Sequence, residues 1–315
     1  MTTLKIPLSV PGSQVNEYKK NYRLLTHNHG RLLLLADDQK VEHLNDDFFG
    51  KNISPEDNNP EHLFKIAAAS GGGVLAAHLG LIARYGRNYR QVPYLIKLNG
   101  RTNLGDNETK DSSELWWSIS DIIKFKKQTG LKIVGIGYTV YLGGRYEARM
   151  LAAVAKAIYE AHQAGLTAVI WMYPRGKNVK EEDIHTIAGG SGVAATLDAD
   201  FVKVKYPYGL KDKNATAKKF SEVTMAAGQT KVICVGGEKR SIPELLEYLE
   251  KQIKIAGTSG LAMGRNLHQR PLKEAVRLAA ALGAIIFSDT DAKKALAIYN
   301  QETKLKKTSR FLGIF

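Results

Sequence analysis

The sequence predicts a single (β/α)8 barrel with a short N-terminal extension. Short apolar runs recur along the chain, roughly 20 to 40 residues apart, and a turn and a helical pattern separate each run from the next. The runs are mostly continuous rather than alternating, which is typical of parallel strands buried on both faces. The alternative, an open doubly wound sheet, is disfavoured because no G-x-G-x-x-G follows the first run.

Eight such runs match the eight strands of a closed barrel. The predicted strands are Leu32–Ala36, Gly73–Ala77, Tyr94–Leu98, Lys132–Tyr138, Ala168–Tyr173, Phe201–Tyr206, Lys231–Val235 and Gly260–Gly264. Long polar loops, Glu42–Pro60 and Gly100–Ser113, follow the first and third strands. We expect both loops at the carboxyl-terminal mouth of the barrel, where active sites of this fold lie.

Apolar residues at helical spacing predict helices between the strands. The clearest stripes are Leu115, Ile119, Ile122 and Ile123, ended by Gly130; Leu151, Val154, Ala155 and Ile158, ended by Gly165; Leu245, Leu249 and Ile253, ended by Gly257; and Leu272, Val276, Ala279 and Ala280. Ser241 and Glu244 have the spacing of a capping box at the start of the third of these helices.

The chain of 315 residues divides into an N-terminal extension (1–30), one barrel domain (31–300) and a basic tail (301–315). Its one cysteine excludes an intramolecular disulfide. The sequence shows no signal peptide and no apolar run long enough to cross a bilayer, so we expect a cytoplasmic protein without a membrane partner.

The net charge of +14 favours anionic partners such as nucleic acid, acidic membranes or phosphorylated metabolites. The basic residues are spread along the chain, and no helix-turn-helix, zinc finger or basic–aromatic module is present in the sequence. We therefore expect no nucleic-acid partner. A barrel that binds nucleic acid and has lost catalysis stays as a distant alternative.

The sixth predicted strand carries two lysines on one face. Side chains alternate along a strand, so Lys203 and Lys205 point the same way, while Val202 and Val204 suit the helix-packed outer face. Burial and a neighbouring cation lower the pKa of an amine, which makes it nucleophilic enough for Schiff-base chemistry. Because Lys205 is nearer the strand end, it is the predicted nucleophile. From this run alone, the alternative that one or both are surface lysines on an edge strand stays open.

Two other strand ends carry polar or aromatic side chains. Trp171 and Tyr173 share a face of the fifth strand, where the indole could wall a pocket and the phenol relay a proton, or both could fill the barrel. Asp38 follows the first strand, within a run of Asp, Glu and His residues that ends at His43. A metal site is not predicted, because the sequence shows no second group of ligands.

Glycines at the ends of the last two strands predict a phosphate site. Gly236 and Gly237 follow the seventh strand, and Gly264 and Arg265 end the eighth. Loops after these two strands are the usual phosphate site of a (β/α)8 barrel. Glycine lets backbone N–H groups approach an anion, and arginine binds one with two hydrogen bonds.

The chain resembles the archaeal-type class I fructose-1,6-bisphosphate aldolases of the deoxyribose-phosphate-aldolase-like superfamily, from about residue 31 to about residue 280. The matching segments are DQ-x-VEH (38–43), LIKLNG (95–100), GYTVYLGG (137–144), VIWMYPRG (169–176), FVKVKY (201–206), VGG (235–237) and GRNLHQR (264–270). Seven segments in the right order carry more weight than any one of them.

The resemblance implies a carbon–carbon lyase that needs no cofactor or metal. It implies that Lys205 forms the Schiff base, that Tyr173 transfers protons and that Asp38 positions the sugar hydroxyls. Trp171 would line the sugar site, and the phosphate site would hold dihydroxyacetone phosphate. The expected reaction is the reversible cleavage of fructose 1,6-bisphosphate in glycolysis or gluconeogenesis.

Two departures from the family pattern, Lys40 and Val235, put the exact substrate in doubt more than the reaction class. The alternative is therefore a related Schiff-base aldolase, or an acyl or aldol transferase, that acts on another phosphorylated sugar. The resemblance also implies a homo-oligomer, such as a decamer.

Overall fold

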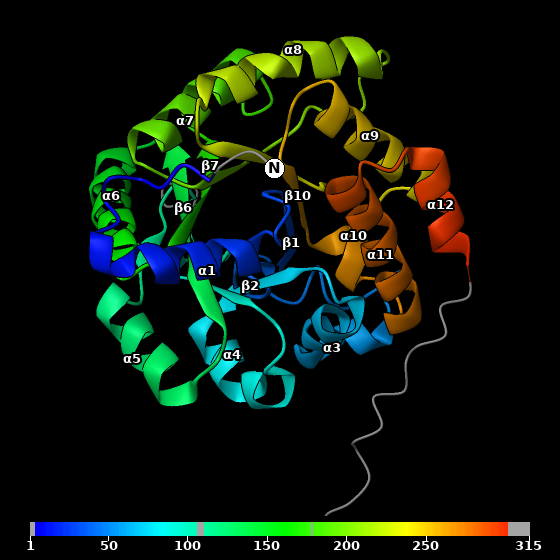
Figure 1. Ribbon diagram of the computed structural model, residues 1–315. Helices are drawn as coiled ribbons and strands as arrows, with labels where there is room; N and C mark the ends of the chain where they lie inside the picture. The colour runs from blue at the N-terminus through cyan, green and yellow to red at the C-terminus, as the bar shows by residue number, and fades with distance from the viewer. Residues whose placement is uncertain (1–3, 106–109, 178, 302–315) are drawn as a thin grey trace, which may run out of the picture.

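The barrel prediction is confirmed. The computed structural model describes residues 4–105, 110–177 and 179–301, which form a closed barrel of eight parallel strands surrounded by helices (Figure 1). The strands are β1 (Leu32–Ala36), β2 (Val74–His78), β3 (Tyr94–Lys97), β6 (Ile133–Leu142), β7 (Thr167–Pro174), β8 (Phe201–Val204), β9 (Lys231–Val235) and β10 (Gly260–Met263). They neighbour one another in chain order, and β1 pairs with β10 to close the barrel. Residues 302–315 of the predicted basic tail lie outside the described residues.

Helices follow the strands and form the outer layer of the molecule (Figure 1). They are α1 (Val15–Leu25), α2 (Gln39–Glu42), α3 (Glu61–Ser70), α4 (Leu79–Tyr85), α5 (Ile119–Thr129), α6 (Glu147–Gln163), α7 (Ile184–Thr196), α8 (Lys213–Ala226), α9 (Ile242–Lys254), α10 (Arg265–His268), α11 (Leu272–Ser288) and α12 (Ala292–Asn300). Short 3-10 turns occupy Gly12–Gln14, Pro55–Asn58 and Gly86–Tyr89, and a small hairpin joins β4 (Asn99–Gly100) to β5 (Glu114–Leu115).

Several predicted boundaries differ from the structure. Strand β6 extends to Leu142, beyond the predicted end at Tyr138, while β8 ends at Val204 rather than at Tyr206. Leu115 belongs to β5 and is exposed, so it is not part of the α5 stripe. The predicted capping box is wrong, because the Ser241 side chain makes no capping hydrogen bond at the start of α9.

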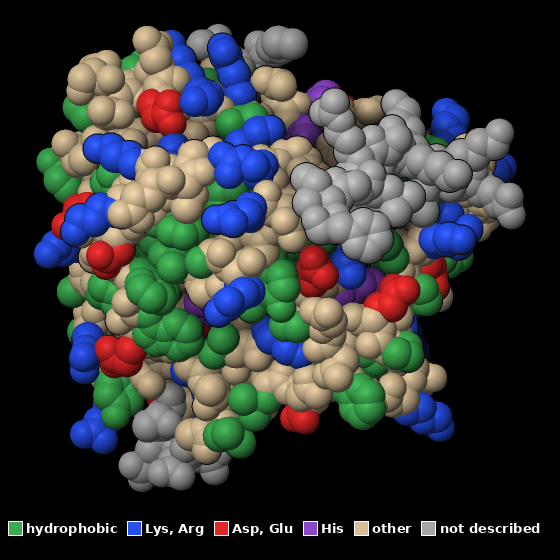
Figure 2. Space-filling model, turned by 90° about the horizontal axis from the view of Figure 1, so that it is seen from below, with side chains coloured by type: hydrophobic (Ala, Val, Ile, Leu, Met, Phe, Trp, Pro, Cys, Tyr) green, Lys and Arg blue, Asp and Glu red, His purple; other side chains and the backbone are tan. Residues whose placement is uncertain are grey.

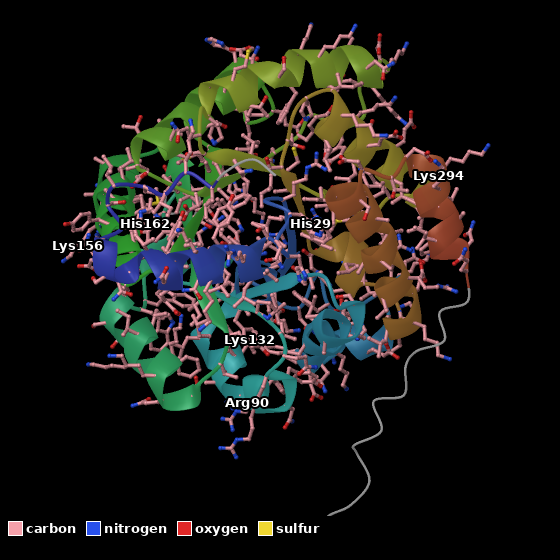
Figure 3. All side chains as sticks on the ribbon, in the orientation of Figure 1. His29, Arg90, Lys132, Lys156, His162 and Lys294 are labelled. Atoms are coloured by element: carbon pink, nitrogen blue, oxygen red, sulfur yellow. The ribbon has the colours of Figure 1, made fainter. Side chains whose placement is uncertain are left out.

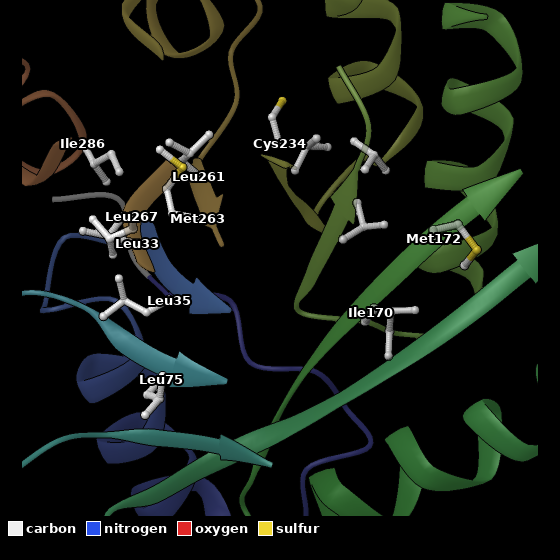
Figure 4. Close-up of a cluster of buried hydrophobic side chains, with 14 of the residues drawn as sticks. Leu33, Leu35, Leu75, Ile170, Met172, Cys234, Leu261, Met263, Leu267 and Ile286 are labelled. Carbon is white, nitrogen blue, oxygen red and sulfur yellow. The ribbon is translucent and has the colours of Figure 1, made fainter. Parts of the chain in front are cut away.

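Two layers of apolar side chains stabilise the barrel. Alternate residues of each strand face the barrel interior or the surrounding helices, so Leu32 and Leu34 pack inside while Leu33 and Leu35 pack outside. Figure 4 shows part of the outer layer, in which strand side chains such as Leu261 meet Ile286 of α11. Strand runs that are apolar on both faces therefore follow from the architecture.

The N-terminal segment forms a helix that the sequence does not reveal. Helix α1 lies across one end of the barrel (Figure 1), and its Tyr18, Tyr22 and Leu25 side chains are buried against the interior layer. Those residues make only a narrow apolar stripe among Lys, Asn and Arg, which hides the helical period. The end that α1 covers is the one where the strands begin, so the opposite end stays available.

A buried network of charged groups attaches this N-terminal segment to the barrel. His162 of α6 is fully buried, and its Nδ1 lies 2.8 Å from Ser9 Oγ and 3.3 Å from Asp198 Oδ2. Its Nε2 lies 3.2 Å from Asp200 Oδ2, and the Tyr18 hydroxyl donates to the same carboxylate. Figure 3 shows His162 beside the first turns of α1.

Neither a membrane-spanning helix among the described residues nor a basic stripe on the face shown in Figure 2 is seen. None of the helices in the described ranges is long and apolar enough to cross a membrane. On the face shown in Figure 2, Lys and Arg side chains lie at many separate places among hydrophobic and acidic ones.

We predict that His162 stabilises the fold in a pH-dependent manner. Burial lowers the pKa of His162, but hydrogen bonds to Asp198 and Asp200 outweigh burial and raise it from 6.5 to about 9. The stabilisation is therefore complete below about pH 6.5, decreases as the pH rises toward 9, and amounts to roughly 3 kcal/mol. Urea unfolding of His162→Gln at several pH values should show lower stability near neutrality and a weaker decline above it. Parallel declines in the variant and the wild type would contradict this.

Candidate active site

The carboxyl-terminal ends of five strands bring six polar or aromatic side chains together inside the mouth of the barrel. Asp38 is the second residue after β1, His78 ends β2, Lys97 ends β3, Trp171 and Tyr173 lie on β7, and Lys203 lies on β8. All except Tyr173 are buried, and Tyr173 is half-buried at the end of its strand. Parallel strands end on the same side of a barrel, which places residues from distant parts of the chain in one pocket.

Lys203 is a buried amine of this cluster. It is 6% exposed, and its Nζ lies 4.7 Å from the centre of the Trp171 ring on the adjacent strand. Burial lowers the pKa of Lys203, and the charge of Lys97 lowers it further, against the opposing effects of Asp38 and Glu42. Burial and a like charge together favour the neutral, nucleophilic form of an amine.

Asp38 lies next to two lysines. Lys97 Nζ is 3.6 Å from Asp38 Oδ2 and 3.9 Å from Glu42 Oε1. Burial alone would raise the pKa of Asp38, but the charges of Lys203, Lys97 and His78 lower it below its ordinary value. Asp38 is therefore ionised and can accept a proton or a hydrogen bond from a sugar hydroxyl.

Tyr173 and His78 are both neutral near pH 7. Burial, followed by the charges of Asp38 and Glu42, holds the pKa of Tyr173 well above its ordinary value, so the phenol keeps its proton. Burial and the charge of Lys97 lower the pKa of His78 to about 4. The mouth of the barrel thus brings together a proton donor, a proton acceptor and an amine whose pKa is lowered by burial.

The structure places Lys205 outside this cluster. Strand β8 ends at Val204, so the alternation that puts Lys203 inside the barrel does not continue to Lys205. The Lys205 side chain is 28% exposed, and its Nζ lies 2.6 Å from Glu181 Oε2 in the loop after β7. The sequence-based prediction that both lysines point into the barrel therefore differs from the structure at Lys205.

The sequence reasoning also missed Lys97, although the segment LIKLNG contains it. A charged residue near the carboxyl end of an apolar strand was the signal that pointed to the β8 lysines, and the same signal is present in β3. His78 gives a weaker version of this signal at the end of β2. Glu42 lies in α2, and its contact with Lys97 depends on how that short helix folds back over the mouth.

The predicted phosphate residues lie on two neighbouring loops that one buried asparagine connects. The Asn266 side-chain amide donates to the carbonyl oxygens of Gly236, Gly237 and Glu238 at 3.1, 3.3 and 2.7 Å. Its Oδ1 accepts from the Arg240 N–H at 2.8 Å. The loops after β9 and β10 are therefore fixed relative to each other, and no separate pattern in the sequence points to Asn266.

Glycine is favoured at these positions. Gly237 has φ of 67°, a left-handed conformation that favours glycine. A Cβ atom at Gly236 would displace the sulfur of Met263, and one at Gly264 would displace the side-chain oxygen of Gln39. Arg265 is partly exposed, and its Nε lies 3.8 Å from Asp47 Oδ2. The two loops thus offer closely packed backbone with a guanidinium at its edge, which suits a phosphate group.

A second group of cations lies at the rim of the mouth. Glu181 accepts from Arg175 Nε at 2.8 Å and also pairs with Lys205. The Arg175 guanidinium lies 4.7 Å from the Tyr141 ring centre and 5.3 Å from that of Tyr173. Arg101 approaches the same Tyr141 ring at 5.3 Å. Arg175 therefore contacts both tyrosine rings, while Arg101 joins the group through Tyr141 and Lys205 joins it through Glu181.

A large cavity lies away from these residues. A cavity of about 1110 Å³ opens between α5 and α6 on the outside of the barrel and contains none of the predicted site residues. In the described parts of the chain, no group of three or more His, Cys, Asp or Glu side chains is arranged to hold a metal ion.

Comparison with known proteins agrees with this geometry. Residues 32–270 match the family described as DeoC/LacD family aldolase. The chain is 47% identical over 303 residues to the fructose-bisphosphate aldolase/6-deoxy-5-ketofructose 1-phosphate synthase of Methanocaldococcus jannaschii, covering 96% of each chain. It is 30% identical to the class 1 fructose-bisphosphate aldolase of Thermoproteus tenax, covering 82% of this chain and 90% of that relative.

Solved structures give the same result. A fructose-bisphosphate aldolase from Slackia heliotrinireducens superposes with a TM-score of 0.91 at 44% identity, covering 96% of this chain and 95% of the other. An archaeal fructose-1,6-bisphosphate aldolase, with its catalytic lysine covalently bound to the carbinolamine intermediate of the substrate, superposes at 0.73 and 28% identity, covering 86% and 99%. The resemblance inferred from the sequence is confirmed, and the chain belongs to the DeoC/LacD family of aldolases.

Proposed function

We propose that the chain is a class I fructose-bisphosphate aldolase, which cleaves fructose 1,6-bisphosphate reversibly into dihydroxyacetone phosphate and glyceraldehyde 3-phosphate. The observation that carries the proposal is the buried Lys203 amine, whose pKa is lowered, beside the ionised carboxylate of Asp38. The names of the relatives from Methanocaldococcus jannaschii and Thermoproteus tenax support the same reaction class.

In the proposed mechanism, the neutral amine of Lys203 attacks the C2 ketone of the sugar, and loss of water gives a protonated imine. Removal of the C4 hydroxyl proton then breaks the C3–C4 bond, and its electron pair moves into the imine to form an enamine. Glyceraldehyde 3-phosphate leaves with its aldehyde at the former C4. Protonation of the enamine at C3 and hydrolysis release dihydroxyacetone phosphate and the free lysine.

Asp38 and Tyr173 divide the proton transfers. The ionised carboxylate of Asp38 is suited to accept the hydroxyl proton, and the protonated phenol of Tyr173 is suited to relay a proton to the enamine. Trp171 forms a wall beside both lysines. Lys97 is the neighbouring cation whose charge, together with burial, lowers the pKa of the nucleophile Lys203.

This proposal moves the Schiff base from Lys205 to Lys203. The reason is geometric: Lys205 pairs with Glu181 at the rim, and Lys203 faces the groups that could serve the reaction. Lys205 then belongs with Arg175 and Arg101 among the cations available to the second phosphate of the substrate. Gly236, Gly237, Gly264 and Arg265 would hold the first phosphate.

A second substrate is favoured by the double name of the Methanocaldococcus jannaschii relative, which is also a 6-deoxy-5-ketofructose 1-phosphate synthase. Such a product carries no phosphate at C6, so the aldehyde that supplies its last three carbons has none either. The two candidate reactions share the lysine and the first phosphate site, and they differ in their need for the rim cations. A cytoplasmic location, a role in glycolysis or gluconeogenesis and a homo-oligomeric state also stay proposals.

The identity of the nucleophile can be tested by borohydride reduction in the presence of dihydroxyacetone phosphate, followed by peptide mass spectrometry. We expect the adduct on Lys203. Lys203→Met should lose the adduct and lower kcat by about a thousandfold or more, because no other group supplies the imine. Lys205→Met should retain the adduct, and the activity should persist in EDTA. An adduct on Lys205 would restore the sequence-based assignment.

Tyr173→Phe tests the proton relay separately from imine formation. We expect kcat for cleavage to fall by roughly 10²–10⁴, the usual contribution of a positioned acid or base. Trapping of dihydroxyacetone phosphate on the lysine should continue, since Tyr173 is not the nucleophile. Wild-type kcat in this variant would remove Tyr173 from the mechanism.

The rim cations can be tested by comparing two substrates. Lys205→Met and Arg175→Met should raise KM for fructose 1,6-bisphosphate by about tenfold, the effect of losing one hydrogen bond to a charged group. Cleavage of fructose 1-phosphate should change little, because this substrate lacks the second phosphate. Lys251→Met, which removes another lysine paired with a glutamate, is the control for surface charge. Equal changes for both substrates would exclude a distal phosphate site here.

A further inference from the structure

An array of three side chains, two of them buried and one half-buried, lies beside the proposed phosphate site and has no part in the mechanism above. His268, at the end of α10, is fully buried, and its Nδ1 lies 2.6 Å from Oδ2 of Asp57, which is 1% exposed. The other ring nitrogen, Nε2, lies 3.4 Å from Gln39 Oε1. Phe48 stacks on the imidazole with a centroid distance of 4.6 Å and an interplanar angle of 8°, which fixes the plane of the ring.

The array ends at the backbone of Gly264. The Gln39 carboxamide lies so close to Gly264 that any Cβ there would collide with it. The same glycine carbonyl accepts from the N–H groups of Leu267 and His268 at 2.8 and 3.1 Å. Gly264 is therefore held between the carboxamide of Gln39 and the first turn of α10. Its position determines where the Arg265 side chain leaves the backbone.

The array also connects this turn to the long loop that follows β1. Asp57 belongs to that loop, and Gln269 at the end of α10 also contacts the loop. The Gln269 Nε2 donates to the Asp47 carbonyl at 2.8 Å, and the Gln269 carbonyl accepts from the Ser54 N–H at 3.1 Å. Asp47 in turn lies beside Arg265. One side of the phosphate site therefore depends on a loop distant from it in the sequence.

We propose that Asp57, His268 and Gln39 are positioning residues that hold the Gly264–Arg265 turn in the conformation that binds the phosphate of the donor ketone. Separating a buried carboxylate from its histidine would leave two polar groups without a hydrogen bond, which costs free energy. The contact therefore fixes the side-chain orientation of both partners. A carboxamide fixed by the histidine then limits the movement of Gly264. The inference rests on the proposed function, because it assigns a task within that reaction.

The experiment compares two ketones that differ only by the phosphate. Borohydride trapping on the full-length protein is titrated with dihydroxyacetone phosphate and with dihydroxyacetone. His268→Phe keeps a ring against Phe48 and removes both nitrogens, and Gln39→Met keeps the length of the side chain and removes the amide. Each variant should raise the half-saturating concentration of dihydroxyacetone phosphate by about tenfold or more and that of dihydroxyacetone by much less.

The matched control is His62→Phe. His62 is also buried, and its Nε2 bonds the Arg270 carbonyl at 3.0 Å in the segment after α10, but it does not contact Gln39 or Gly264. This variant should leave the half-saturating concentrations of both ketones near those of the wild type. An equal increase in His62→Phe would show a general loosening of the loop and overturn the proposal.

The remaining outcomes separate this inference from the proposed function. If His268→Phe does not fold, Gln39→Met still decides the question. Unchanged half-saturation for dihydroxyacetone phosphate, or equal changes for the two ketones, would overturn the positioning role. Absence of any adduct on the wild-type protein with either ketone would instead overturn the aldolase proposal.

Discussion

Two buried lysines share the carboxylate of Asp38, and this arrangement of charges determines the properties of the pocket. Lys97 lies 3.6 Å from the carboxylate, and the charge of Lys203 acts on the same group. A carboxylate beside two amines stays ionised. Burial, together with the charge of Lys97, lowers the pKa of Lys203. Glu42 provides a second carboxylate beside Lys97, so that Lys97 keeps a partner when a substrate hydroxyl engages Asp38.

The barrel can hold these buried charges because the residues that carry them lie at the ends of packed strands. Below them, the interior is filled by apolar side chains such as Leu34, Val169 and Phe201, and helix α1 covers the far end. Charges in such a position cannot move toward solvent without breaking the strands that carry them. The pocket is therefore polar at one end of an apolar barrel, which strengthens each electrostatic interaction within it.

The loops above the strands carry the groups that we propose to bind phosphate. Asn266 connects the loops after β9 and β10, and the Asp57–His268 contact joins that pair to the loop after β1. At the end of β7, Glu181 pairs with both Arg175 and Lys205, and Arg175 contacts the Tyr173 ring. The pocket thus has a closely packed glycine-rich side and a cation-rich side, with the buried lysine between them.

Much of this could be predicted from the sequence, and the reason is that the relevant signals are local. The apolar runs from Leu32–Ala36 to Gly260–Met263 identify eight strands, and their separation by helical patterns implies a parallel barrel. The positions of Asp38, Tyr173 and the glycine pairs at strand ends follow from that topology. Helix α1 was not predicted, because three buried side chains among polar ones leave too weak a period.

The tertiary structure decided the points that depend on where a strand ends and on which distant residues meet. Alternation puts Lys203 and Lys205 on one face only while the strand continues, and β8 ends between them at Val204. No local pattern records that Lys97 of β3 reaches Asp38 after β1, or that Asp57 meets His268 across 211 positions of the chain. The sequence by itself determined the barrel and the kind of chemistry at its mouth. Only the tertiary structure determined which lysine lies inside the barrel, because burial and neighbouring charge are properties of the folded chain.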